Sequence, residues 1–152
     1  MPVRPARPSD LSEILALVRE LADYEEMADE VVLRPEQLEA ALFGREPVAH
    51  VLVAEADGGE VAGMALWFPT FSTFLGQPGI WLEDLFVRPA HRRRGHGRAL
   101  LAELRSMTDG RVEWDVLDSN TPAQEFYDQL GAAPMDGWTR YRWSPAEQAA
   151  HR

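Results

Sequence analysis

The stretch VRPAHRRRGHGRALL, residues 87–101, holds five arginines, two histidines and two close-spaced glycines, and it contains no acid. It follows an apolar run typical of a strand and leads into a run typical of a helix. A strand that enters a helix through a glycine-rich loop brings unpaired backbone N–H groups and the positive end of the helix dipole to one point. Such a point favours anions, so we expect residues 92–98 to bind a phosphate-like group.

The residue types of this loop fit the same expectation. Glycine lets the backbone approach a phosphate closely, and arginine adds charge-assisted hydrogen bonds. Arg98 in the first helical turn opposes the dipole unless an anion neutralises both. The dinucleotide fingerprint fits poorly because Leu100 stands where its third glycine belongs, and no Walker lysine follows. A solvated basic patch is the alternative interpretation.

The rest of the composition narrows the class of protein. The chain has 152 residues and a formal net charge of −10, which argues against nucleic acid as a partner and suits the attraction of cations. No apolar run approaches the ~20 residues that span a bilayer, and no signal peptide is recognisable. The absence of cysteine excludes a thiolate metal site and agrees with a cytoplasmic location. We expect no metal, no membrane association and one domain, residues 1–145, followed by a short tail, 146–152.

Periodicity and turn residues predict the order of the elements. Helices are expected from Ser9 or Asp10 to about Met27, then over 35–43, from Gly95 or Gly97 to about Met107, and over 122–130. Strands are expected over 3–5, 48–55, 60–68, 80–87, 111–117 and 137–143, with 48–55 and 60–68 forming an antiparallel hairpin around Asp57-Gly58-Gly59. This order predicts an α/β (α+β) fold in which helices pack on a mixed sheet.

Adjacent acids interrupt the apolar strand 80–87. Glu83 and Asp84 should point to opposite faces of the sheet, and a buried carboxyl there must be paired or protonated. Burial would raise its pKa toward the range of a useful base. We interpret Asp84 as structural and Glu83 as functional, although an ion pair to an arginine would explain either residue.

Four further polar residues are candidates for a functional site. Glu25 continues the apolar stripe of the first helix, although fraying into solvent explains it about as well. Glu113 and Asp115 share one face of their strand, either in a cleft or at a solvent-facing edge. Tyr127 lies on the inward face of a helix that Thr121 would cap, and by its pattern alone it is a core residue.

Several blocks of the sequence carry a family resemblance. Arg92-x-x-Gly95-x-Gly97 resembles the pyrophosphate loop of the GNAT superfamily of acetyl-CoA-dependent N-acetyltransferases. The blocks VRPARPSDLSEILALVRELADYEEM, FSTFLGQPGIWLEDLFVRP and DSNTPAQEFYDQLGA resemble the diamine and thialysine branch of that superfamily, in the same order. The resemblance implies a single-domain GNAT fold with a mostly antiparallel central sheet, helices on both faces and a homodimer.

The resemblance also implies a role for particular residues. The backbone of Leu85, Phe86 and Val87 would pair with the pantetheine arm of acetyl-CoA. The remaining implied contacts with the cofactor are Arg92, Arg93, Arg94, Gly95, His96, Gly97, Arg98, Asn120, Thr121, Pro122 and Ala123. The implied substrate contacts are Tyr24, Glu25, Glu83, Glu113, Trp114, Asp115 and Asp136.

The expected reaction is direct attack of a neutral primary amine on the acetyl thioester, without a covalent enzyme intermediate. Glu83 would act as base through a water molecule, and a backbone N–H near Phe86 or Val87 would stabilise the oxyanion. The resemblance implies that Tyr127 protonates the leaving thiolate. Acids around one pocket favour a substrate that carries two or more ammonium groups. The resemblance implies a lysine-like or thialysine-like amino acid, a diamine or a polyamine. Acetylation of a protein N-terminus or lysine, and non-catalytic CoA binding, are the alternatives.

Overall fold

The computed structural model describes residues 2–145, and the predicted tail over 146–152 lies outside the described residues. The chain divides into two compact units between Asp115 and Val116, and each unit is described by itself. The helices and strands of the first unit are β1 (Val3–Pro5), α1 (Leu11–Tyr24), α2 (Pro35–Phe43), β2 (His50–Glu55), β3 (Val61–Ser72), β4 (Gln77–Val87), α3 (His96–Ser106) and β5 (Val112–Glu113). The second unit holds α4 (Thr121–Gln129).

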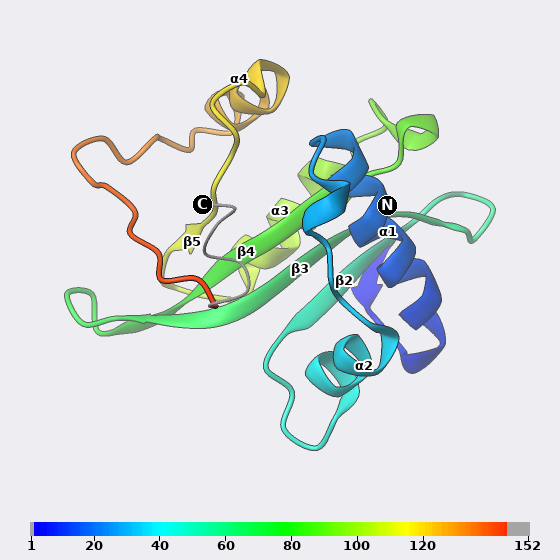
Figure 1. Ribbon diagram of the computed structural model, residues 1–152. Helices are drawn as coiled ribbons and strands as arrows, with labels where there is room; N and C mark the ends of the chain where they lie inside the picture. The colour runs from blue at the N-terminus through cyan, green and yellow to red at the C-terminus, as the bar shows by residue number, and fades with distance from the viewer. Residues whose placement is uncertain (1, 146–152) are drawn as a thin grey trace. The chain divides into compact units, whose positions relative to one another are not determined.

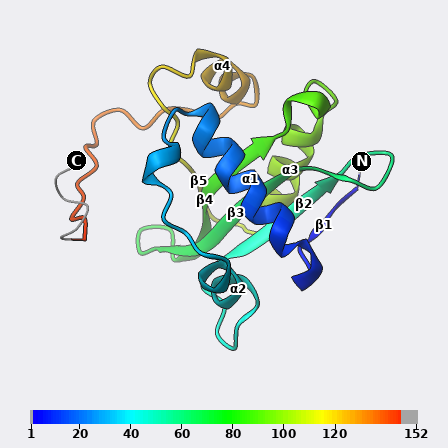
Figure 2. The same cartoon turned by 45° about the vertical axis from the view of Figure 1, so that its right-hand side comes forward.

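The sheet of the first unit has five strands in the order β1-β2-β3-β4-β5. All neighbours are antiparallel except β4 and β5, which pair in parallel. Figures 1 and 2 show α1 on one face of this sheet and α3 on the other. The predicted mixed, mostly antiparallel sheet with helices on both faces is therefore confirmed.

Alternation along the strands supplies a core on each face of the sheet. One core joins Ile14 and Leu17 of α1 to Leu38 and Leu42 of α2 and to Val53 on the sheet. Leu100 and Leu104 of α3, both fully buried, belong to the opposite face. Burial of such aliphatic side chains contributes about 1.5–3 kcal/mol each, so this packing fixes α1 and α3 relative to β4.

Ion pairs attach α1 to the sheet at its start and along its length. Arg4 of β1 donates to both carboxylate oxygens of the buried Asp10, at 2.8 and 3.1 Å, and this guanidinium lowers the pKa of the Asp10 carboxyl. At the end of β4, Arg88 reaches Glu13 at 3.1 Å and Glu20 at 3.0 Å. Asp10 was expected as a possible cap of α1, but its carboxylate instead accepts from Arg4 and from the Arg7 amide.

Helix α1 ends earlier than its apolar pattern predicts. Glu26 has a left-handed backbone with φ 58°, and the Met27 amide donates to Ala22 O at 2.7 Å. This arrangement is a Schellman-type helix end formed without glycine. The helix therefore ends at Tyr24, and Glu25 lies at its cap, directly before the strained residue.

Two predicted strands differ from the structure. The strand expected over 111–117 is reduced to Val112–Glu113, and no strand is assigned to 137–143 among the described residues. A segment forms a strand only where a neighbouring strand pairs with its backbone N–H and C=O groups. The alternation of side chains in one segment does not show whether such a neighbour exists. The segment 137–143 instead exposes large side chains, including Trp138 and Trp143.

Candidate functional site

A β-bulge in β4 places the adjacent acids Glu83 and Asp84. In the register of β3 and β4, Leu66 pairs with Asp84 and Trp67 pairs with Leu82, so Glu83 is the extra residue. A bulge interrupts the alternation of side chains and bends the strand locally. The regular alternation on which the expectation of opposite faces rests is therefore interrupted at Glu83.

Asp84 is the most perturbed carboxyl of this region. It is half-buried, and burial raises the pKa of Asp84 to about 7, with further contributions from the negative charges of Glu83 and Glu25. Burial also raises the pKa of Glu25 at the end of α1. Asp84 therefore changes its charge near neutrality, and the presence of the other two carboxyls within electrostatic reach defines an acidic cluster of Glu25, Glu83 and Asp84.

Glu83 differs from its neighbour in exposure. Its side chain is exposed, and Oε1 accepts a hydrogen bond of 3.0 Å from the indole Nε1 of Trp81. The sequence predicts that Glu83 is buried in an apolar strand. In the structure, Asp84 is the more buried of the two acids. An exposed carboxylate held by one donor keeps access to water, which a base acting through water requires.

The edge of β4 opens beyond its short pairing with β5. Only Ile80 and Trp81 have register partners in β5, whereas β4 continues to Val87. Gly110 anchors the start of β5, because a Cβ at this position would collide with Pro78 O. The Arg88 amide donates to Ala62 O of β3 at 2.8 Å, so alternation turns the backbone groups of Leu85 and Val87 toward the open edge. The amide and carbonyl of Leu85 and the amide of Val87 can thus pair with an extended ligand, whereas the amide of Phe86 faces β3 and Val87 O accepts from Arg92.

The loop that follows β4 has the geometry of an anion site. We call residues 92–98 the arginine loop. Two of its residues are left-handed, Arg93 with φ 65° and Gly95 with φ 86°, and Gly95 is the N-cap of α3 as predicted. The Ala99 amide is the donor to Gly95 O, at 2.9 Å, so the amides of His96 to Arg98 are not used within the helix. Left-handed turns of this kind direct successive amides into one concavity.

The arginines of the loop differ in what they touch. Arg93, Arg94 and Arg98 are exposed side chains that stand around the helix start. Arg92 is also exposed, but its Nε donates to Val87 O at 2.9 Å. Its guanidinium carbon lies 4.9 Å from the ring centroid of Tyr24 and 5.4 Å from that of Phe86.

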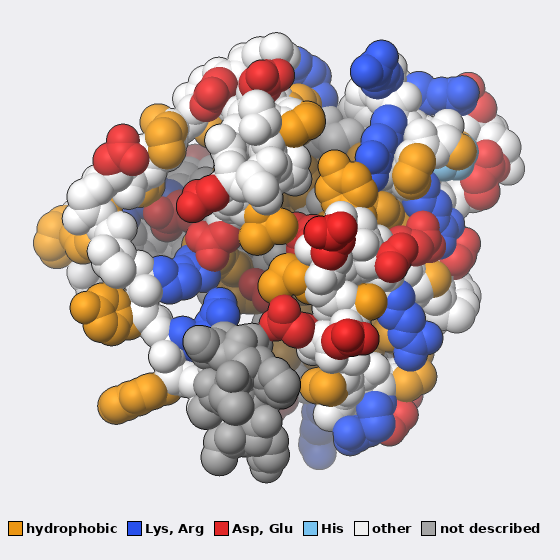
Figure 3. Space-filling model, turned by 45° about the horizontal axis from the view of Figure 1, so that its top comes forward, with side chains coloured by type: hydrophobic (Ala, Val, Ile, Leu, Met, Phe, Trp, Pro, Cys, Tyr) orange, Lys and Arg blue, Asp and Glu red, His pale blue; other side chains and the backbone are white. Residues whose placement is uncertain are grey.

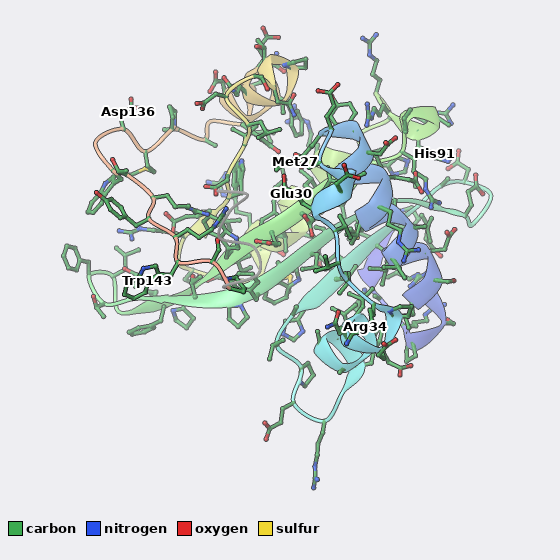
Figure 4. The ribbon with its side chains drawn as sticks, viewed as in Figure 1. Met27, Glu30, Arg34, His91, Asp136 and Trp143 are labelled. Carbon is green, nitrogen blue, oxygen red and sulfur yellow. The ribbon has the colours of Figure 1, made fainter. Side chains whose placement is uncertain are left out.

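His96 packs beneath the loop. It is 4% exposed, its Nδ1 has no hydrogen-bond partner, and its ring meets His91 edge-on with centroids 6.2 Å apart. Burial lowers the pKa of His96, with help from His91 and Arg94, so the imidazole is neutral at pH 7. Figure 4 labels His91 in the turn before the arginine loop and Met27 beyond the end of α1.

The predicted substrate contacts of the first unit lie on three segments. Tyr24 and Glu25 end α1, Glu83 lies in the bulge of β4, and Glu113, Trp114 and Asp115 end or follow β5. Glu113 is the register partner of Trp81 and is partly buried, whereas Asp115 is exposed. Figure 3 shows acidic and basic side chains interspersed over the face that it presents. Asp84, which the sequence analysis interpreted as structural, lies within electrostatic reach of both Glu25 at the end of α1 and Glu83 in β4.

The second unit holds the other predicted residues. Asn120, not Thr121, caps α4, because its side-chain oxygen accepts from the Ala123 amide at 3.3 Å. Gln124 does not close a capping box, since its amide donates to Leu117 O and Asp118 O, each at 2.9 Å. Tyr127 is partly buried with its ring 5.6 Å from that of Phe126. Asp136 is exposed in the irregular segment after α4, as Figure 4 shows.

Neither metal ligation nor membrane crossing finds support in the described part of the chain. Within residues 2–145, no group of three or more His, Cys, Asp or Glu side chains is arranged to hold a metal ion. No helix among these residues has the length and apolar character needed to cross a bilayer.

Comparisons with known proteins give a family match and individual relatives. Residues 14–132 match the model of the acetyltransferase (GNAT) family. The chain is 34% identical to thialysine N-epsilon-acetyltransferase of Bos taurus over 155 residues, which cover 93% of this chain and 91% of the relative. It is 42% identical to L-ornithine N5-acetyltransferase NATA1 of Arabidopsis thaliana over 82 residues, which cover 51% and 36%.

Solved structures share the fold. An integron cassette protein from the mobile metagenome of V. cholerae superposes with a TM-score of 0.78 at 20% identity, covering 99% of this chain and 96% of that one. The aminoglycoside N-acetyltransferase AAC(6')-Iy in complex with CoA superposes with a TM-score of 0.67 at 23% identity, covering 95% and 100%.

Proposed function

Because the chain belongs to the acetyltransferase (GNAT) family, we propose that it acetylates a primary amine of a small molecule carrying two or more positive charges. It is an N-acetyltransferase, and its acetyl donor is acetyl-CoA. The proposal concerns the acceptor, the residues that bind it and the path of the protons.

The acidic cluster is the main observation that supports a cationic amine as the acceptor. Burial makes Asp84 resist ionisation, and the negative charges of Glu83 and Glu25 add to this effect. An ammonium group placed among them would offset this repulsion, whereas an anionic or neutral acceptor would not. Relatives named for thialysine and L-ornithine support a lysine-like amino acid as the acceptor, with diamines and polyamines as further members of the class. Tyr24, Glu113, Trp114, Asp115 and Asp136 are proposed as its other contacts.

The arginine loop and the open edge of β4 fit the donor. The amides at the start of α3, with Arg93, Arg94 and Arg98, would hold the diphosphate of acetyl-CoA. The backbone of Leu85 faces the open edge and would pair with the amides of the pantetheine arm, whereas Val87 O accepts from Arg92 and the Val87 N–H is proposed below for the oxyanion. Asn120, Thr121, Pro122 and Ala123 are proposed as additional contacts. The donor supplies the thioester, and these residues hold it in an orientation that exposes its carbonyl carbon to attack.

The chain's own groups would move the protons. We assign Glu83 as the base that accepts the ammonium proton through a water molecule, which its exposed position allows. The Val87 amide, directed to the open edge, would donate to the developing oxyanion. Tyr127 would give its hydroxyl proton to the departing sulfur. Asp84 and Glu25 would hold the second charge of the acceptor, and an acceptor cation would lower the pKa of Asp84 and ionise it.

Oligomeric state, location and domain extent remain predictions. We propose a cytoplasmic homodimer whose catalytic domain spans residues 1–145, on the strength of the family resemblance. Size-exclusion chromatography with light scattering at two protein concentrations checks the dimer, and a monomer at both would contradict it.

A panel of acceptors tests the function. Thiol release from acetyl-CoA is measured with thialysine, lysine, ornithine, a diamine, spermidine and a peptide with a free N-terminus. We expect turnover with at least one of the dicationic small amines and little with the peptide. Preference for the peptide would favour a protein acetyltransferase. Binding of acetyl-CoA without turnover on any amine would favour a non-catalytic CoA-binding protein.

A further inference from the structure

Arg92 occupies a different environment from the other arginines of its loop. Its Nε–H donates to Val87 O at 2.9 Å, which turns the side chain back toward the end of β4. The guanidinium then lies over the rings of Tyr24 and Phe86, 4.9 and 5.4 Å from their centroids. The two rings are themselves 6.3 Å apart. Arg92 is therefore engaged by one carbonyl and two aromatic faces on the protein itself.

Its ring contacts reach the C-terminal end of α1. Tyr24 is the last residue of α1 and is 50% exposed, Glu25 is the cap, and Glu26 has the strained φ of 58°. The ion pairs of Arg88 hold α1 through Glu13 and Glu20, which leaves the turn after Glu20 to other contacts. A cation at this place also matches the negative end of the α1 dipole.

From this placement we propose that Arg92 is a positioning residue for the amine acceptor, in place of the diphosphate contact that the family resemblance implies. It fixes the last turn of α1, and so Tyr24 and Glu25, against the end of β4. The arginine loop that binds the donor and the helix end that binds the acceptor are thereby joined by one side chain. Ordering of the loop by acetyl-CoA then orders the acceptor side as well, which gives positive coupling between the two ligands. The acceptor part of this inference rests on the proposed function.

Three variants separate this role from phosphate binding. Arg92→Gln removes the cation and the Nε donor, and Arg92→Lys keeps the cation but cannot both donate to Val87 O and cover two rings. Arg94→Gln is the matched control, because it removes the same charge from the same exposed loop without a contact to Tyr24 or Phe86.

The first readout needs neither ligand. Hydrogen exchange of the amides of residues 21–27 is measured in the free proteins. We expect exchange about 5- to 10-fold faster in Arg92→Gln, an intermediate change in Arg92→Lys and less than about a twofold change in Arg94→Gln, as suits one cation–π contact and one hydrogen bond. Unchanged exchange in Arg92→Gln would overturn the proposal. This readout stands even if the wild-type protein acetylates no amine, which would refute the proposed function alone.

The second readout divides donor from acceptor. Calorimetry with CoA gives the donor Kd, and steady-state kinetics with the best amine of the panel gives KM and kcat. We expect Arg92→Gln to raise the amine KM about 5- to 10-fold with a smaller change in CoA Kd, and Arg94→Gln to do the reverse. Equal weakening of CoA by both variants with an unchanged amine KM would assign Arg92 to the phosphate and overturn the proposal. In a Tyr24→Leu background, Arg92→Gln should have little further effect on KM, and additive losses would count against it.

Discussion

The arginine loop and the acidic cluster lie in the same unit of the chain, and they tolerate their charge by opposite means. The loop keeps Arg93, Arg94 and Arg98 in solvent and leaves its backbone amides to a ligand. In the cluster, burial raises the pKa of Asp84 to about 7, and the negative charges of Glu83 and Glu25 add to the shift. Backbone amides suit the proposed diphosphate of acetyl-CoA, which is the same for every acceptor. Burial, in contrast, adjusts the pKa of the carboxyls that we propose to bind the amine acceptor.

Neither region returns a proton to the leaving thiolate, so the largest expected effect lies outside both. Tyr127→Phe removes only the hydroxyl that we assign to this step. We expect kcat to fall by about 10²-fold with little change in acetyl-CoA affinity, the scale of one acid or base group. Stopped-flow or steady-state thiol release gives kcat, and calorimetry gives the affinity. Wild-type turnover in this variant would refute the assignment, and Phe126→Leu serves as a packing control on the same helix.

The next effect concerns the exposed member of the acidic cluster. Glu83→Gln keeps the acceptor for the Trp81 indole but cannot take up a proton. We expect kcat to fall by about 50-fold, less than for a base in direct contact, because solvent water can carry part of the proton flux. The loss should diminish as pH rises toward the pKa of the free amine. A pH-independent loss, or a change confined to KM, would reassign Glu83 to binding.

The arginine loop was predictable from sequence because its properties are local. Gly95 at the helix start, the left-handed turn and the bare amides all follow from a strand, two glycines and a helix adjacent in the chain. The different contacts of its arginines were not predictable, because Tyr24, which Arg92 contacts, is remote in sequence.

The acidic cluster depended on features that a single segment does not encode. Alternation assigned the apolar environment to both acids of β4, and the bulge then exposed Glu83 and half-buried Asp84. Register is a property of two strands, so one strand cannot reveal it. The same limit explains the short β5 and the absence of the strand expected over 137–143.

Stability against pH tests the burial of Asp84, with an effect below that of the catalytic variants. Its native pKa of about 7 lies above the ordinary value of 3.8, so between these pH values the native state binds more protons than the unfolded state. The free energy of unfolding should therefore fall as pH rises from about 4 to about 7 and then level off. Asp84→Asn should remove this fall and be about 2 kcal/mol more stable than wild type at pH 8, less than the full shift implies because the side chain keeps some exposure.

Urea unfolding followed by tryptophan fluorescence at pH 5 and pH 8 measures this difference. The control is Glu39→Gln on the exposed face of α2, which should change stability equally at both pH values. An Asp84→Asn variant that is less stable than wild type at pH 8 would mean that Asp84 is paired in the free protein, and the contrast between the two regions would fail.

The smallest expected effect tests the backbone nature of the loop. Gly95 has φ 86° with open space where a Cβ would stand, so Gly95→Ala meets conformational strain and no collision. Relaxation of the N-cap would misdirect the amides of α3, and we expect the Kd for CoA to rise about 5- to 10-fold, the scale of about 1 kcal/mol of strain. Calorimetry with CoA measures the change, and amine KM should be nearly unaffected.

Arg98→Gln, which removes a charge and leaves the backbone as it is, should weaken CoA binding mainly at low salt, whereas the loss of affinity in Gly95→Ala should persist at high salt. If the loss of CoA affinity disappeared at high salt in both variants, the loop would bind its anion through the charges of its side chains. The backbone amides would then not bind the anion directly.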